Sequence, residues 1–420
     1  MQPLLDLSRL ISSTGRAALS GLDRVELAYA RHCAAMPEQE RCFVARSPWG
    51  PFSLLPDRLA LPLVAQWEAL TRGEAAARPL KALGLAARAW LMSGLGVLPL
   101  HRRLRGMPGA TLLVVAHQSL AESAPIAALK RRGARFIPII HDLIPITYPE
   151  YSRPRQIALH VRRLANVSAL ADAVLTDCEA VRADVLGYFG GLGREMPPVV
   201  AAPLGFDLPP LRSIPDGPVP ERPYFVTLGT IEPRKNHLLL LNLWRDLAER
   251  LGPQAPRLVI LGRRGWQNET VFRLLDRVPA FPGLVEERRD ATDADVAFTL
   301  RHARALLFPS FAEGYGIPLI EALSLGTPAI CADIPSLREV GKGVPEFISP
   351  LDGVGWRDAV LDYSRPDSPA RQAQIARIAG FLQPRWDQHF NALQQAVARI
   401  STRSSDNTTA SVAVQSAGMR

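Results

Sequence analysis

The sequence feature that most constrains the fold is an alternation, repeated along the chain, between short apolar runs rich in β-branched residues and segments with helical periodicity. This alternation is typical of parallel β-sheets whose strands are connected by helices. In the first half of the chain, strands are expected at 4–11, 111–117, 135–141, 173–176 and 198–202. In the second half, strands are expected at 224–228, 257–261, 305–308 and 328–331, with helices at 237–251 and 317–325. We therefore predict two doubly wound parallel-sheet α/β domains, with a ligand site in the crevice between them.

The division into domains follows from length and proline content. A chain of 420 residues is too long for one ordinary hydrophobic core, so two domains are expected. Residues 208–222 contain too much proline for a helix or a central strand, which predicts a linker. We expect a first domain at 1–207, a second at 223–382, a further helix at 383–400, and a disordered tail at 401–420 that is rich in Ser, Thr, Ala and Asn.

The cysteine pattern and the N-terminal residues indicate the cellular compartment of the protein and whether a metal site is expected. Four cysteines are scattered without a Cys-x-x-Cys pair or nearby histidines, so neither a zinc site nor a disulfide framework is supported. Residues 1–10 lack a basic region followed by an apolar run, which argues against a cleaved signal. We expect a cytoplasmic protein. No Asp-x-Asp or histidine cluster with ligand spacing is found among the residues assigned to the expected cleft, so no metal and no cofactor are expected.

The longest apolar stretch, 79–100, contains Lys81, Arg88 and three glycines, which makes it a poor membrane span. Basic residues follow it directly: His101, Arg102, Arg103 and Arg105. The stretch therefore suits an interfacial helix attracted to anionic lipid, although an apolar helix buried in the first domain explains the same residues. The net charge of +9 suits phosphate-bearing ligands, an acidic membrane or simply a solvated basic surface. Nucleic acid is disfavoured, because the Lys/Arg clusters are not interleaved with aromatic residues.

The most informative segment is 309–323, in which a strand ends, a loop with two glycines follows, and a helix begins near Ile317. Gly314 and Gly316 allow close backbone approach, and the free N–H groups of the helix start suit a phosphate or a sugar hydroxyl. Glu313 and Glu321 flank this site, and carboxylates suit the vicinal hydroxyls of a sugar. The spacing alone is equally consistent with purely structural roles, in which Glu313 is exposed to solvent and Glu321 caps a neighbouring loop.

A second segment, 228–237, lies between the first strand and the first helix of the second domain. It carries Arg234 and Lys235, two cations at the turn where a diphosphate-binding loop is expected. Fixed cations in a water-poor cleft stabilise the charge that develops on a departing diphosphate. The alternative is a solvated basic turn.

Two histidines stand at strand ends of the first domain, His117 and His141. A lone histidine is often structural, but the end of a strand in an α/β domain faces the ligand crevice. His141 is the better candidate for a catalytic role, and the adjacent Asp142 is expected to orient it.

The segment around the two glutamates resembles glycosyltransferase family 4, a retaining group with the two-domain GT-B architecture. Glu313 and Glu321 have the seven-residue separation of its signature, and the match extends over 308–325 into Gly326-Thr327-Pro328. The resemblance implies that Glu313 contacts the transferring sugar and that Glu321 binds the donor ribose. It also places the loop residues on the donor side: Gly314, Tyr315, Gly316 and Ile317.

The resemblance assigns further residues. Lys235 falls on the family's usual lysine, whereas Thr230 stands where many members have an arginine, and we take Arg234 as its substitute. His141 is similar to a strand-end histidine that bonds the donor sugar near the reacting carbon, and His117 lines the acceptor side. The segment 20–26 resembles a glycine-containing turn near donor phosphate and acceptor, with Gly21 on the donor side and Arg24 on the acceptor side.

The resemblance also assigns roles to the domains: the first is acceptor-side, the second binds the nucleotide sugar, and the helix at 383–400 crosses back to the first. The segment 228–237 is similar to bacterial mannosyltransferase-like members that assemble surface polysaccharides. We therefore expect transfer of a hexose from a nucleotide sugar, GDP-mannose favoured, to a hydroxyl of a lipid-linked or polysaccharide acceptor. Two alternatives stay open, a nucleotide-sugar epimerase on the same scaffold and an inactive scaffold subunit of a glycan-assembly complex.

Overall fold

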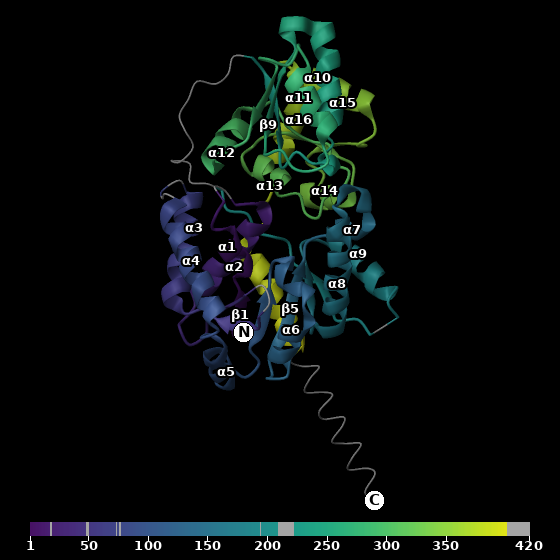
Figure 1. Ribbon diagram of the computed structural model, residues 1–420. Helices are drawn as coiled ribbons and strands as arrows, with labels where there is room; N and C mark the ends of the chain where they lie inside the picture. The colour runs from purple at the N-terminus through teal and green to yellow at the C-terminus, as the bar shows by residue number, and fades with distance from the viewer. Residues whose placement is uncertain are drawn as a thin grey trace, which may run out of the picture.

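The computed structural model describes residues 1–16, 19–47, 50–72, 74, 77–193, 195–208 and 222–400. These residues form two α/β domains, drawn one above the other in Figure 1, with the N-terminal domain below. The predicted tail 401–420 and all but the two end residues of the predicted linker 208–222 lie outside the described residues.

The described part of the N-terminal domain contains a seven-stranded sheet in the order β3-β2-β1-β4-β5-β6-β7. Its strands are β1 (Pro3–Asp6), β2 (Cys42–Arg46), β3 (Phe52–Leu54), β4 (Thr111–Val114), β5 (Arg135–Ile140), β6 (Val174–Thr176) and β7 (Val199–Ala201). Its helices are α1 (Ser8–Ser13), α2 (Gly21–Ala34), α3 (Asp57–Thr71), α4 (Ala77–Ser93), α5 (Val97–Arg105), α6 (Ser123–Lys130), α7 (Ile144–Thr147), α8 (Pro154–Leu170) and α9 (Glu179–Gly190). Short 3-10 turns occupy η1 (His117–Ala121) and η2 (Pro149–Tyr151).

The C-terminal domain is built around a parallel sheet with the order β10-β9-β8-β11-β12-β13, six strands in the part of the chain described. The strands are β8 (Tyr224–Leu228), β9 (Arg257–Leu261), β10 (Val285–Arg288), β11 (Leu306–Phe308), β12 (Ala329–Ala332) and β13 (Glu346–Ile348). The helices are α10 (His237–Leu251), α11 (Glu269–Arg277), α12 (Asp293–His302), α13 (Ile317–Ser324), α14 (Pro335–Gly341), α15 (Gly353–Ser364) and α16 (Pro369–Ile378), with 3-10 turns at η4 (Pro233–Lys235) and η5 (Gly252–Gln254).

The predicted α/β architecture with two doubly wound sheets is confirmed, with two corrections. The expected strand 4–11 was wrong in its second half, because the Asp6 carboxylate accepts the N–H of Ser8 at 3.0 Å and starts helix α1 there. Residues Leu7, Leu10 and Ile11, which extended the apolar run, have helical spacing and are buried in α1 and its start. The N-terminal sheet is also not wholly parallel, since the edge strand β3 runs antiparallel to β2.

The chain returns to the N-terminal domain at its end. Helical residues 386–400 lie against that domain in Figure 1, and His389 contacts it through Tyr29 Oη at 2.6 Å and Ala202 O at 2.9 Å. Gly205 lies so close to this helix that a Cβ on it would stand 2.3 Å from the backbone nitrogen of Trp386. Two segments therefore run side by side between the domains, and the N–H of Phe206 donates to Pro384 O at 3.1 Å.

The two domains also contact each other across the strand ends. Glu339 of α14 accepts the N–H groups of Glu179 and Ala180 at 2.7 and 2.9 Å, which satisfies the first turn of α9 in the other domain. Tyr315 donates its hydroxyl to Leu204 O at 3.0 Å. The carboxyl ends of the parallel strands of both sheets thus face one crevice.

Candidate active site

The loop after β8 presents two cations to the crevice. Gly229 has a φ of +137° and Asn236 a φ of 55°, so the chain turns sharply at both ends of the segment before α10 begins at His237. Between them the 3-10 turn Pro233–Lys235 carries Arg234 and Lys235. The loop geometry therefore fixes the two predicted cations next to each other.

Glu313 pairs with both cations. Its Oε1 lies 2.5 Å from Lys235 Nζ, and its Oε2 lies 2.8 Å from an Arg234 guanidinium nitrogen. Arg234 also donates to Ala312 O at 2.9 Å and pairs with Glu232 at 2.6 Å. The side chains of Glu313 and Lys235 are only 7% and 9% exposed, so this pairing is sheltered from water. The structure thus brings three predicted site residues into one cluster.

The cluster fixes the charge of Glu313. Burial alone would raise the pKa of the Glu313 carboxyl, but Arg234 and Lys235 outweigh burial and lower this pKa to about 2. Burial and the neighbouring Arg234 lower the pKa of the Lys235 ammonium, against the opposing effect of Glu313. Glu313 is therefore an ionised carboxylate at every physiological pH, and a weak base.

The loop 313–317 meets the N-terminal domain at van der Waals distance. A Cβ on Gly314 would lie 2.1 Å from His141 O, so only glycine allows this approach of the two domains. Gly316 has a φ of +95° and precedes α13, which begins at Ile317. On the facing helix α2, a Cβ on Gly21 would lie 3.2 Å from Ile317 Cδ1. The predicted glycines of both domains therefore mark the contact between them.

Glu321 and Arg24 meet in a second ionic cluster between the domains. Arg24 of α2 forms an ion pair with Asp293 at the start of α12, and its Nη1 lies 3.8 Å from Glu321 Oε1. Burial raises the pKa of Glu321 to about 7, and the positive charge of Arg24 only partly opposes it. A cavity of about 280 Å³, lined mostly by apolar side chains, opens beside these residues between α2 and α13.

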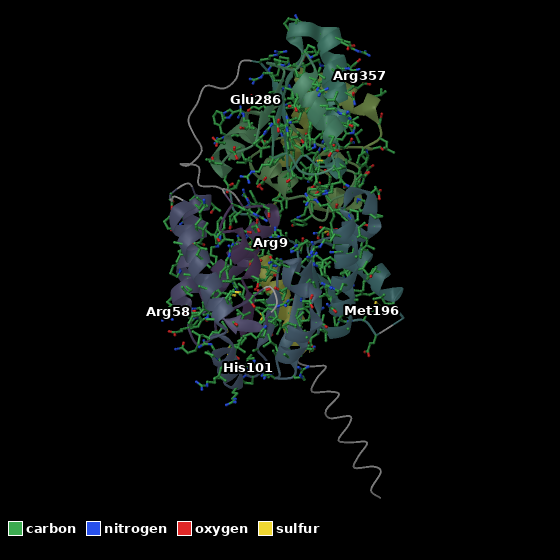
Figure 2. All side chains as sticks on the ribbon, viewed as in Figure 1. Arg9, Arg58, His101, Met196, Glu286 and Arg357 are labelled. Atoms are coloured by element: carbon green, nitrogen blue, oxygen red, sulfur yellow. The ribbon has the colours of Figure 1, made fainter. Side chains whose placement is uncertain are left out.

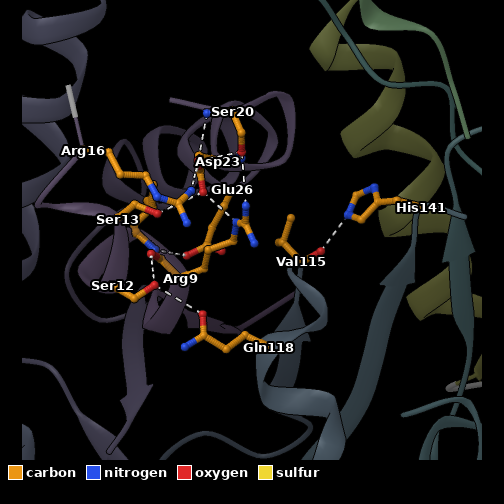
Figure 3. A network of polar contacts seen from close by, with 11 residues as sticks. Arg9, Ser12, Ser13, Arg16, Ser20, Asp23, Glu26, Val115, Gln118 and His141 are labelled. Carbon is orange, nitrogen blue, oxygen red and sulfur yellow. Dashed lines mark hydrogen bonds and ion pairs between the residues drawn. The ribbon is translucent and has the colours of Figure 1, made fainter. Parts of the chain in front are cut away.

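His141 is held by two acceptors. Its Nδ1 lies 2.7 Å from Asp177 Oδ2, and its Nε2 lies 2.7 Å from Val115 O, the contact drawn in Figure 3. Burial would lower the pKa of His141, but the Asp177 carboxylate and the Val115 carbonyl outweigh it, so the pKa is raised. Both ring nitrogens donate, which describes an imidazolium. The prediction that Asp142 orients His141 was wrong, because the Asp142 carboxylate turns back to accept the N–H of Ile144 at 3.0 Å.

A third histidine completes a cluster at the strand ends of the N-terminal domain. The ring centroid of His117 lies 5.4 Å from that of His141 and 5.1 Å from that of His160 on α8. Burial, together with the other two histidines, places the pKa of His117 well below its ordinary value. Sequence reasoning missed Asp177 and His160. Asp177 directly follows β6, so the strand-end argument used for His117 would have found it, whereas His160 lies within a helix and carries no such signal.

The turn before α2 is organised by Asp23, as Figure 3 shows. Ser20 and Asp23 form a reciprocal capping box at the helix start, and Arg9 approaches the Asp23 carboxylate at 2.6 Å. Asp23 is completely buried. This framework fixes Gly21 and Arg24 where α2 enters the crevice.

Comparison with known proteins finds a family match in the second half of the chain. Residues 214–343 match the family model described as glycosyl transferases group 1. The matched range contains the cluster of Arg234, Lys235 and Glu313 and also Glu321.

Curated relatives align over larger parts of the chain. The O-antigen chain mannosyltransferase B of Escherichia coli is 28% identical over 264 residues, which cover 62% of this chain and 69% of the relative. The serotype-specific mannosyltransferase WbdA of Escherichia coli is 28% identical over 240 residues, and the chain spans only 28% of its length. The O-antigen chain mannosyltransferase RfbU of Salmonella typhimurium is 28% identical over 35% of this chain and 40% of its own length.

Solved structures share the fold across nearly the whole chain. Sucrose-phosphate synthase from Thermosynechococcus elongatus superimposes with a TM-score of 0.59 at 15% identity, over 96% of this chain and 100% of that one. HepE from Anabaena, solved in complex with UDP, gives a TM-score of 0.58 at 13% identity, over 98% and 100%. At these identities the likeness concerns the fold, which is the GT-B fold. The family match over 214–343 and this fold identify the chain as a glycosyltransferase.

Proposed function

We propose that the chain is a member of glycosyltransferase family 4 that moves a hexose from a nucleotide sugar to a hydroxyl group and retains the anomeric configuration. The observation that carries the proposal is the buried cluster of Glu313, Arg234 and Lys235 at the strand ends of the C-terminal domain. A carboxylate that stays ionised beside two cations suits a reaction in which positive charge develops on a sugar and negative charge on a leaving diphosphate.

In this proposal the C-terminal domain binds the donor. Lys235 has three N–H donors and Arg234 has five, and the pairs with Glu313 and Glu232 leave several of them for diphosphate oxygens. In this proposal the loop at Gly314, Tyr315 and Gly316 and the start of α13 at Ile317 also supply backbone N–H groups to the donor. No metal ion is needed, because the two cations supply the counter-charge.

Retention follows in this scheme from same-face attack. Both Glu313 oxygens are engaged by cations, and a carboxyl with a pKa of about 2 is a weak base and a weak nucleophile. We therefore assign the deprotonation of the acceptor hydroxyl to an oxygen of the leaving diphosphate. The oxygen–carbon bond to the acceptor forms on the face from which the carbon–oxygen bond to the diphosphate breaks. Glu313 supplies fixed negative charge to the sugar at that moment.

The acceptor enters, in this proposal, from the N-terminal domain. In this proposal the imidazolium of His141 supplies positive charge at the strand ends of the N-terminal domain, and its backbone carbonyl lies at the contact with Gly314. His117, whose ring lies next to those of His141 and His160, lines the acceptor side. The names of the relatives support mannose as the sugar and O-antigen assembly as the setting. We propose GDP-mannose as the donor and a hydroxyl of a lipid-linked or polysaccharide acceptor. The four cysteines are free and buried, in keeping with a reducing cytoplasm.

The test of donor binding is a thermal-shift screen of the purified chain against GDP, UDP, ADP and TDP sugars. A ligand that binds only the folded state at one hundred times its Kd adds about 2.7 kcal/mol to the free energy of unfolding. We expect one nucleotide to raise Tm selectively, and Lys235→Ala to abolish that rise. Absence of a shift with every nucleotide at millimolar concentration contradicts the proposal. Nuclear magnetic resonance of the product then reads the anomeric configuration, and an inverted product refutes retention.

The proposed ribose contact of Glu321 predicts a pH dependence. Because burial raises the pKa of Glu321 to about 7, the carboxylate that can accept both ribose hydroxyls becomes populated only as pH rises through that value. We expect the affinity for the nucleoside diphosphate to increase by up to about tenfold between pH 6 and pH 8. Isothermal titration across this range measures the effect. Glu321→Gln is the control, because the pH dependence of its affinity reports only the titration of the ligand. A pH dependence as steep in Glu321→Gln as in wild type would rule out the proposed role of Glu321.

A further inference from the structure

The outer face of α4 and α5 carries large apolar side chains that the other described residues leave exposed. Leu85, Met92, Leu95 and Leu98 are 64%, 71%, 61% and 57% exposed, and we call these four residues the α4–α5 face. The opposite sides of both helices are already buried in the domain core, at Leu80, Ala87, Leu91, Leu100 and Leu104. A cluster of exposed side chains of this size marks an interaction surface.

The segment that carries the face is basic. The sequence contains no Asp or Glu between Glu74 and Glu122, whereas it contains these basic residues: Arg78, Lys81, Arg88, Arg102, Arg103 and Arg105. Lys81, Arg102 and Arg105 are exposed and form no ion pair among the described residues, whereas Arg88 donates to Ile11 O and Arg103 to the backbone of Glu38 and Arg41. His101, labelled in Figure 2, marks this end of the molecule, far from the C-terminal domain.

The corner between α4 and α5 is tied to strand β3. The break between the helices is held by β3, because Trp90 Nε1 donates to Leu54 O at 2.8 Å and Leu54 N donates to Gly96 O at 2.9 Å. Gly96 lies so close to β3 that a Cβ would stand 2.5 Å from Leu54 O. Leu95 therefore projects outward from a fixed corner, and docking requires no ordering of this segment.

The geometry of the pair suits the surface of a membrane and not a crossing. No single helix among the described residues is long and apolar enough to span a bilayer, and the segments Pro79–Ser93 and Val97–Arg105 meet that test only jointly. They are bent by 81° relative to each other. With their inner sides in the domain core, they can present only their outer side to lipid.

We propose that the α4–α5 face docks the chain on an anionic membrane. Leu85, Met92, Leu95 and Leu98 enter the boundary between headgroups and acyl chains, and the unpaired cations contact lipid phosphates. Exposed apolar side chains on a segment that carries cations and no acidic residue of its own match a surface that is apolar within and negative outside. The inference goes beyond the transfer reaction, because the face lies outside the crevice. It does not depend on which sugar is transferred.

The experiment is co-sedimentation of the full chain with vesicles of phosphatidylglycerol and phosphatidylcholine, compared with phosphatidylcholine alone. We expect wild type to bind the anionic vesicles strongly, less so at high salt, and the neutral vesicles weakly. Leu95→Glu with Leu98→Glu, and separately Arg102→Gln with Arg105→Gln, should each weaken binding by about tenfold or more. Leu351→Glu is the matched control, because Leu351 is 82% exposed on the C-terminal domain. This variant should bind the anionic vesicles as wild type does.

The readouts separate this inference from its rivals. Each variant should keep the Tm of wild type and its thermal shift with nucleotide, since none of these residues touches the crevice. Anionic-vesicle binding that survives both double variants overturns the proposal, and so does equal binding to neutral vesicles. A wild-type dimer that becomes a monomer on Leu95→Glu with Leu98→Glu would also overturn it, because the face would then be an interface between copies. Vesicle binding is measured without donor or acceptor, so it does not depend on the proposed reaction.

Discussion

Gly314→Ala is expected to lower kcat by about a hundredfold or more while both domains stay folded. The added Cβ would stand 2.1 Å from His141 O and 3.1 Å from Asp142 Cβ, and a backbone carbonyl cannot rotate away as a side chain does. The two domains must therefore separate, and a displacement of about 1 Å between reacting groups costs about a hundredfold in rate. Steady-state kinetics with the donor identified by thermal shift measures the loss.

Gly187→Ala provides the matched control for this substitution. Gly187 lies in α9 on the surface, and nothing stands within 4 Å of the Cβ it would gain. The control should keep wild-type kcat. Small-angle scattering should show a more open shape for Gly314→Ala than for Gly187→Ala. A Gly314→Ala enzyme with wild-type kcat and wild-type shape would show that transfer does not require this contact of the domains.

Glu313→Gln is expected to reduce kcat by about a hundredfold to a thousandfold without weakening the binding of the nucleoside diphosphate. The amide has the shape of the carboxylate but no charge, so it cannot stabilise positive charge on the sugar. Arg234 and Lys235 then lose a competing partner, which leaves more of their N–H donors for diphosphate oxygens. Calorimetry of nucleotide binding beside steady-state kinetics separates the two effects. Loss of one member of a buried ionic cluster should also reduce the free energy of unfolding by about 3 kcal/mol.

The control for Glu313→Gln is Glu232→Gln. Glu232 also pairs with Arg234, at 2.6 Å, and is equally buried, but it makes no ion pair with Lys235 among the described residues. A small loss of kcat is expected there. Full transfer activity in a folded Glu313→Gln protein would instead support an inactive scaffold subunit whose partner performs the chemistry.

The strands that sequence reasoning found are those with a continuous apolar run in a buried position. Strands β8 and β9 were predicted with their observed bounds, because every residue in them favours a buried parallel strand. Strand β10 was missed, since its sequence Val-Glu-Glu-Arg at a sheet edge carries no apolar run. Strands β3 and β13, at other sheet edges, and the buried strand β2 were missed as well. Local composition therefore predicted every central strand except β2, and of the edge strands only β7.

The residues of the candidate site also fall into a group that the sequence predicted and a group that it did not. The loop residues around Glu313 and Lys235 could be predicted because each motif is contiguous, and a strand end followed by a glycine loop has a known position in a parallel sheet. Asp177 beside His141 follows the neighbouring strand of the same sheet, so the strand-end argument could have found it. The partners across the two domains could not be predicted. Asp293 beside Arg24 and Glu339 at the start of α9 are brought there by the docking of the domains, which no local pattern encodes.

The return of helical residues 386–400 to the N-terminal domain has a consequence for the order of biosynthesis. His389 and Phe390 are buried against Tyr29 of α2, so part of the first domain's core comes from nearly the last described residues of the chain. The C-terminal domain is continuous in sequence and has all its strands once residue 348 has left the ribosome. The N-terminal domain, although translated first, must wait for the final helix. The domain that is made second is therefore the first that can complete its packing.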